Sequence, residues 1–281
     1  MRLLSILTPA ETELILENRT ASFKDLMKLT FMDLLLKKVI KIVEVEKQSH
    51  PRNDSRVYTY IEKGKNFANC KPNPHESIYT TPFEEEDDIQ ILFHHFVKIG
   101  YEATGKSIGY KKKVKKTGNL DAFLKSSFFL NLFGMIRLNK QGEKTKKEIS
   151  NYLKEVDSKI NHLLENDKEK ALEILLTIGG NIFLLKNLNF ELLKNIDKQL
   201  LAQKRSESNS ESDDYGYWNL HMDFYEHNDL FSDDFDNGTS FQSYLDDTLD
   251  SFDTQFDASG CSVFDSGCSS CSGCGGCGGC S

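Results

Sequence analysis

The last fourteen residues of the chain, CSSCSGCGGCGGCS, place a cysteine at every third position. Two thiolates separated by two residues can chelate one ion, and four thiolates satisfy the tetrahedral geometry of zinc. Glycine and serine between the cysteines allow the tight backbone that such chelation needs. The tail is therefore a candidate site for zinc or another thiophilic metal. Its candidate ligands are Cys261, Cys268, Cys271, Cys274, Cys277 and Cys280.

Two other interpretations of this tail stay open. Zinc modules usually separate their two cysteine pairs by a dozen or more residues, and this tail has no such insert to fold. An iron–sulfur run would need a three-residue spacer and a proline, which are also missing. The thiols can instead be the substrate of a modifying enzyme, or the tail can stay reduced and inert. The spacing alone gives the three interpretations about equal weight.

Charged residues, like the cysteines, are distributed unevenly along the chain. All 35 Lys and Arg lie at or before Arg205, together with 27 of the 43 Asp and Glu, so this part carries +8. The remaining 76 residues hold 16 acids and no base. Opposite charges of this size favour docking of the acidic end on the basic body, and salt would weaken that docking.

The sequence indicates a reducing location. Six of the seven cysteines lie in the tail, and only Cys70 lies in the body. The N-terminus has too short an apolar run for a signal peptide. The longest apolar stretch, ALEILLTIGGNIFLL (171–185), contains Glu173 and is too short for a membrane span. We therefore expect a cytoplasmic protein without a membrane span, in which the thiols are not joined in a disulfide framework.

The amino-terminal sequence predicts three helices and a hairpin. A capping box at Thr8, followed by proline, begins the first helix, and Ser22 and Thr30 cap two further short helices. Two alternating, β-branched stretches follow, KIVEVEK (41–47) and VYTYIEKGK (57–65). Three helices followed by a two-stranded hairpin is the order of a winged helix, so we expect a winged-helix-like domain.

A second, helical unit is predicted after a proline-containing linker. The stretch EEEDDIQILFHHFVKIGYEATG (84–105) starts with acids, where the helix dipole favours them, and its apolar residues keep helical spacing. A basic loop, YKKKVKKTGN (110–119), separates it from further apolar helical stretches. A second capping box at Thr145 predicts the start of one of them, and Asn189 is predicted to cap the last.

Beyond Ser206 the sequence predicts disorder. Aromatic residues and leucines alternate irregularly with acids, and charge of one sign without a consolidated apolar face cannot offset the entropy of ordering. Acidic-aromatic segments are typical binding surfaces, which predicts a protein partner or a modifying enzyme for this end. The predicted organisation is a winged-helix-like domain at 1–67, a linker at 68–83, a helical domain at 84–203, a disordered acidic-aromatic linker at 204–260 and a Gly/Ser/Cys-rich tail at 261–281.

The basic loop supports an alternative function. Its lysines would suit phosphate contacts in a nucleic-acid binder. The predicted helix FMDLLLKKV (31–39), however, offers no Asn, Gln or Arg to read base edges. The candidate nucleic-acid contacts are Lys111, Lys112, Lys113, Lys115 and Lys116.

Catalysis has little support in the sequence. The chain contains no phosphate-binding G-x-x-x-x-G-K-[ST], no G-x-S-x-G and no H-E-x-x-H. We therefore expect no enzymatic activity and name no catalytic residues.

Four stretches together carry a family resemblance: LTPAETELIL (7–16), SFKDLMKLTFMDLLLKK (22–38), LTIGGNIFLLKNLNFELLKNIDKQL (176–200) and CSGCGGCGGC (271–280). They resemble the near-uncomplex domain family of bacterial proteins, in which a helical N-terminal region precedes a low-complexity glycine- and cysteine-rich terminus. The resemblance implies the same architecture here and brings no established activity. Many members of that family look membrane-anchored, whereas this sequence predicts no spanning helix.

One expectation and one alternative follow. We expect a mainly α protein with a small β-hairpin, acting as a non-enzymatic docking or scaffold protein whose cysteine tail binds a thiophilic metal or is modified on its thiols. The alternative is a winged-helix nucleic-acid-binding regulator that is autoinhibited by its acidic tail.

Overall fold

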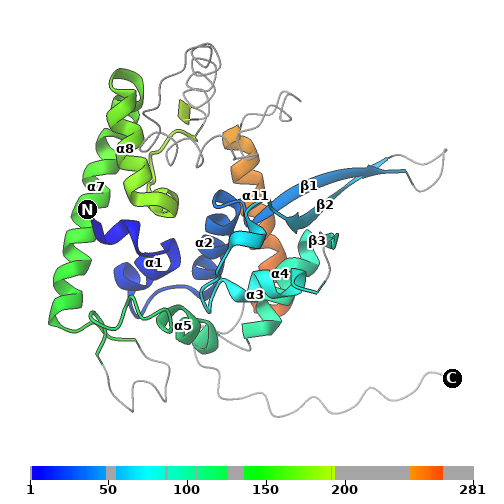
Figure 1. Cartoon of the computed structure of the whole chain (residues 1–281), viewed down its shortest axis with the longest axis horizontal. Coiled ribbons are helices and arrows are strands. Elements are labelled where there is room, and N and C mark those ends of the chain that lie inside the picture. The colour runs from blue at the N-terminus through cyan, green and yellow to red at the C-terminus, as the bar shows by residue number, and fades with distance from the viewer. Residues whose placement is uncertain are drawn as a thin grey trace.

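The computed structural model describes residues 2–48, 55–85, 88–104, 107–125, 136–190, 192–193 and 241–261. These residues are mostly helical, with one small antiparallel sheet, as the sequence predicts (Figure 1). Within these ranges, no helix has both the length and the apolar character needed to cross a membrane.

The first two helices start where the sequence predicts. A 3-10 turn, η1 (Arg2–Ser5), precedes α1 (Pro9–Glu17). The capping box is present, because Thr8 Oγ1 accepts from the Glu11 amide at 3.3 Å and the Glu11 carboxylate accepts from the Thr8 amide at 2.7 Å. Ser22 caps α2 (Phe23–Leu36).

The winged-helix arrangement is not confirmed, because α2 is one helix where the sequence predicted two. Thr30, the predicted second cap, lies inside α2, and its hydroxyl donates to the Leu26 carbonyl at 2.9 Å. The same hydroxyl accepts from the Tyr110 hydroxyl at 2.6 Å. A threonine that bonds back along its own helix does not end that helix. Residues 2–48 therefore contain two α-helices before the hairpin.

The predicted hairpin is confirmed and gains a third strand. Strand β1 (Ile40–Lys47) pairs antiparallel with β2 (Arg56–Lys63), and β3 (Ile91–Leu92) pairs with the other edge of β2, in the order β1-β2-β3. The helix predicted to begin near residue 84 starts only at Phe93, because the backbone of β3 is hydrogen-bonded to the sheet.

The predicted linker at 68–83 contributes to the core. It contains the end of η2 (Phe67–Asn69), then α3 (Ser77–Thr80) and η3 (Thr81–Phe83). Tyr79 and Phe83 are fully buried. The prolines that suggested an irregular linker instead flank short helical turns, with Pro82 in the first turn of η3.

The second half of the body is helical, with boundaries that differ from the predicted ones. Residues 110–115 of the predicted basic loop belong to a helix, because Tyr110 and Val114 lie four residues apart and are both buried. Thr145 does not begin a helix, since Asn139 Oδ1 already caps that helix by accepting from the Gly142 amide at 2.8 Å. The elements are α4 (Phe93–Thr104), α5 (Ser107–Lys115), α7 (Lys140–Asn166), α8 (Lys168–Ile178) and the 3-10 helix η4 (Gly179–Leu184).

The buried apolar side chains form one cluster that crosses the predicted domain boundary. It runs from Leu4 in η1 to Phe256 near the end of the described chain. Helices α7 and α8 lie on one side of α1 and α2, with the sheet and α4 on the other (Figure 1). Asn181 of η4 joins the two halves, since its side-chain amide donates to the carbonyls of Leu4 and Leu7 at 3.0 Å each.

Candidate functional site

Of the six predicted metal ligands, only Cys261 lies among the residues that the structure describes. Cys261 ends the π-helical turn η7 (Asp257–Cys261). Among the residues that the structure describes, no group of His, Cys, Asp and Glu is arranged to hold a metal ion. Metal binding by the tail stays a prediction. The ligands that lie outside the described residues are Cys268, Cys271, Cys274, Cys277 and Cys280.

Part of the acidic end is a helix packed on the body, which corrects the expectation that all of 204–260 is disordered. Helix α11 (Phe241–Phe256) contacts α2 and α4. Leu245, Phe252 and Phe256 on its inner face are at most 3 % exposed. Residues 204–240 lie outside the described residues, so the prediction for them is untested.

Aromatic side chains form the centre of this docking interface. The ring of Phe252 stacks on Phe31 of α2 with centroids 5.4 Å apart. The ring of Phe256 lies edge-on to Phe23 at 5.3 Å and to Tyr101 of α4 at 5.8 Å. Aromatic pairs at these distances add to the stabilisation from burial alone, so α11 is part of the folded body.

Two ion pairs at the rim connect the acidic end to the basic body, as the charge division favoured. Lys24 lies 3.3 Å from Asp257, and Lys28 lies 2.9 Å from Asp253. Both lysines are on α2, four residues apart. The two aspartates are also four residues apart, at the end of α11 and the start of η7. Helices α2 and α11 therefore pair in an antiparallel direction, and the end of α11 and the start of η7 supply Phe252 with Asp253 and Phe256 with Asp257.

The Lys28–Asp253 pair is expected to contribute about 1 kcal/mol to docking, because both side chains are partly shielded from water. Lys28→Ala should therefore speed hydrogen exchange of the α11 amides by roughly fivefold at low salt and by less at high salt. Lys98→Ala is the matched control, since Lys98 forms an exposed pair with Glu102 on α4. Equal effects of the two variants would contradict the assignment.

A second polar feature is a pair of buried carboxylates around Lys37, whose own side chain is 42 % exposed. The Lys37 ammonium lies 2.7 Å from Asp33 and 3.0 Å from Glu76, whose carboxylates are 1 % and 4 % exposed. Burial raises the pKa of Asp33 to about 6, although Lys37 opposes the rise. Burial also disfavours ionised Glu76, but Lys37 and the Asn73 amide outweigh it and lower the pKa of Glu76.

His75 and Glu11 extend this cluster toward α1. The Nε2 atom of His75 lies 3.3 Å from Thr8 Oγ1, and burial lowers the pKa of His75 to about 4, so the ring is neutral at pH 7. Glu11 accepts hydrogen bonds from Thr117 and Asn119 as well as from its own helix cap. His75 and Glu11 are fully buried, so the cluster is an internal network that joins α1, α2 and α3 rather than an open active site.

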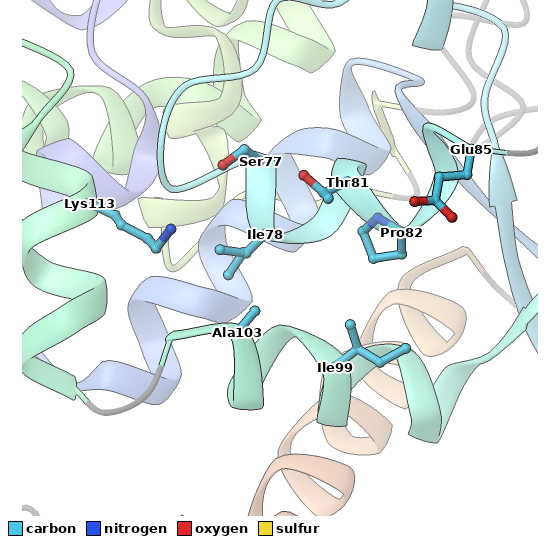
Figure 2. Close-up of a pocket in the computed structure, with 8 residues that line it drawn as sticks. All are labelled: Ser77, Ile78, Thr81, Pro82, Glu85, Ile99, Ala103 and Lys113. Carbon is cyan, nitrogen blue, oxygen red and sulfur yellow. The ribbon is translucent and has the colours of Figure 1, made fainter.

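A surface pocket of about 490 Å³ lies between α3, η3 and α4 (Figure 2). Its apolar lining consists of Ile78, Pro82, Ile99 and Ala103. Figure 2 shows Lys113 of α5 and Glu85 at opposite ends, with the ammonium of Lys113 directed toward the pocket.

The predicted nucleic-acid contacts lie on α5 and just beyond its end. Lys112 and Lys116 are exposed on the side away from the buried Tyr110 and Val114. The remaining three are partly buried: Lys111, Lys113 and Lys115. The helix therefore presents part of the predicted positive patch to solvent, and Lys113 belongs to the pocket.

Cysteine chemistry in the body has little support. Cys70 is half-buried and free, and burial raises the pKa of its thiol, which lowers the thiolate fraction at pH 7.

The fold defines a class in coarse terms: a mainly helical protein with a three-stranded antiparallel sheet and a docked C-terminal helix. Compared with known proteins, the chain matches no family model, no curated protein sequence and no solved structure. The resemblance to the near-uncomplex domain family stays a prediction.

Proposed function

We propose that the chain is a non-enzymatic docking protein whose body anchors a C-terminal cysteine series. The cysteines bind zinc or another thiophilic metal, or they are presented to an enzyme that modifies their thiols. The docked helix α11 supports this proposal most directly, because it attaches the start of the cysteine series to the folded body through buried aromatic rings and two ion pairs.

The position of α11 gives the tail a defined origin. Cys261 follows Asp257 by four residues, and Asp257 is held by Lys24. The remaining five cysteines follow at 268–280 with only serine, glycine, valine, phenylalanine and aspartate before and between them. This composition offers thiolates without a core, which suits a small, exposed and exchangeable metal cluster or an accessible modification substrate.

The mass of the full chain from its native host tests this proposal. An added mass in the non-denatured protein that disappears on denaturation would identify a bound metal. A covalent addition that persists and maps to 261–280 would identify modification. Replacing all six cysteines of the tail with serine is expected to abolish either signal, whereas Cys70→Ser, the matched control, should keep it. The bare sequence mass in both states would contradict the proposal.

Two exposed lysines, Lys112 on α5 and Lys116 just after it, support a second candidate, a nucleic-acid-binding regulator with a winged-helix-like unit. In this function the acidic end would restrain binding, since it carries 16 acids and no base. The full chain should then bind short duplex DNA at low salt, and Lys112→Glu with Lys116→Glu should remove that binding and its salt dependence. The double variant Lys24→Glu, Lys28→Glu loosens α11 and so removes the restraint. If neither the full chain nor this variant bound DNA, the nucleic-acid-binding candidate would be ruled out.

A further inference from the structure

A dipeptide recurs in the acidic end and is absent from the body. Phe-Asp occurs at 235–236, 252–253, 256–257 and 264–265, and nowhere in the first 230 residues. The two copies at the end of α11 and the start of η7 make the same kinds of contact. In each, the phenylalanine packs on aromatic rings of the body and the aspartate pairs with a lysine of α2. The repeat is therefore a docking unit that needs an apolar surface beside a lysine.

The pocket between α3 and α4 offers such a surface and has no occupant among the described residues. Ile99 on its wall is 36 % exposed, unusually high for a large apolar side chain here. Lys113 lies at one end of the apolar lining and forms no ion pair within the described part of the chain. Glu85 at the opposite end would repel a carboxylate, so an acidic occupant has one favoured orientation.

We propose that Phe264-Asp265 docks in this pocket, with the phenyl ring on the apolar lining and the Asp265 carboxylate against Lys113. This inference rests on the docking role proposed above and is independent of which chemistry the cysteines perform. It names the occupant of the pocket as the copy of the repeat that directly follows α11.

The geometry of α4 favours this copy over the one at 235–236. Tyr101 contacts Phe256 at the carboxyl end of α11, while Ile99 and Ala103, two residues away on either side, line the pocket. Residues two apart point to opposite faces of a helix, so the pocket lies on the face of α4 away from α11, and the chain leaving α11 has to pass around the end of α4 at Thr104. The three residues from Cys261 to Phe264 can extend up to about 10 Å. This reach is similar to the diameter of a helix with its side chains, which sets the scale of the distance around α4.

Attachment to the same chain makes even a shallow pocket effective. A short tether gives the phenylalanine a local concentration in the millimolar range, so a contact too weak to bind a free peptide is still populated. Docking there would place the segment between Cys261 and Cys268 beside the lysines of α5. A neighbouring ammonium favours the thiolate form of cysteine, which is the form that binds metal and reacts.

Photo-cross-linking of the full chain tests the proposal. A benzoylphenylalanine at position 264 replaces one aromatic side chain with another, and its cross-links are expected within 77–85 and 99–103. The same probe at position 235 is the control and should give at least tenfold fewer cross-links there. Cross-links from 264 that map elsewhere or only to another molecule, or equal yields from the two positions, would overturn the proposal.

A charge exchange separates a specific contact from simple proximity. Lys113→Glu is expected to lower the yield from 264 about threefold, and adding Asp265→Lys should restore it. An unchanged yield in Lys113→Glu, or no recovery in the double variant, would overturn the assignment of Lys113. These measurements locate Phe264, whereas the mass measurement reports on the thiols, so either proposal can fail while the other holds.

Discussion

Phe252→Ala is expected to release α11 from the body. The Phe252 ring is fully buried and stacks on Phe31 and Phe256. Truncating a buried phenylalanine to alanine typically costs about 3–5 kcal/mol, because apolar contacts are lost and a cavity remains. Since α11 lies at the end of the described fold, we expect this cost to appear first as local opening. Hydrogen exchange of the amides in 245–257 should rise by at least about 100-fold, more than in the remaining helices.

Two comparisons make this result specific. Phe252→Leu keeps most of the apolar volume and should speed exchange far less than alanine does. Leu249→Ala alters a partly buried residue of the same helix and should have an intermediate effect. If Phe252→Ala left exchange of α11 unchanged, or if all helices exchanged equally faster, independent release of α11 would be contradicted.

The signal for α11 was present in the sequence but weak. Leu245, Leu249, Phe252 and Phe256 follow the spacing i, i+4, i+7, i+11, which is one face of a helix. The stripe is short and lies within a longer run of acids and aromatics that has no period. Composition over the whole segment therefore predicted disorder, while the stabilising partners, two lysines and several aromatic rings, are over 140 residues away in the sequence.

Local sequence patterns predicted three helix caps correctly and two incorrectly. Thr8, Ser22 and Asn189 were predicted as caps, and each accepts the expected backbone hydrogen bond. Thr30 and Thr145 have the same local character but lie inside helices. A threonine hydroxyl can bond to a carbonyl of its own helix as well as cap an end, so which occurs depends on packing that the local sequence does not contain.

The cluster around Lys37 had only half of a local signature. Asp33 and Lys37 lie four residues apart along α2, but Glu76 comes from a segment about 40 residues further on, which was predicted to be a linker because of its prolines. Apolar patterning finds faces of helices, but it does not reveal which acids lie beneath them. Only the packing of the segment that begins α3 against α2 brings Glu76 to the lysine that Asp33 already contacts.

Lys37→Met is expected to destabilise the fold by about 2 kcal/mol at neutral pH, since it leaves two buried carboxylates without compensation. The effect is smaller than for a fully buried pair because the Lys37 side chain is 42 % exposed and water screens its charge. Methionine preserves much of the apolar stem, so the loss reflects the ammonium rather than the packing. Urea unfolding followed by circular dichroism measures the effect. The control is Lys41→Met, which breaks the more exposed pair with Glu62. It should cost about 1 kcal/mol or less.

The deficit of Lys37→Met should shrink as the pH falls. Lys37 lowers the pKa values of Asp33 and Glu76, so its removal raises both in the folded state. A carboxyl with a raised folded-state pKa contributes stability below its unfolded value and loses it as the pH rises through the folded value. Asp33 already titrates near 6 in the wild type, so the variant should approach the wild type between about pH 8 and about pH 5.

His75 does not reverse this trend. Burial lowers the folded-state pKa of His75 to about 4, below the ordinary histidine value of 6.5, so both proteins become less stable as the pH falls from 6.5 to about 4. Because the variant and the wild type both lose this stability, the His75 contribution largely cancels when their free energies of unfolding are subtracted. Lys37 also contributes to lowering the His75 pKa, so its removal reduces the loss in the variant and narrows the deficit further. A deficit that grew on acidification, or one no larger than that of Lys41→Met at pH 7, would contradict a buried cluster held by Lys37.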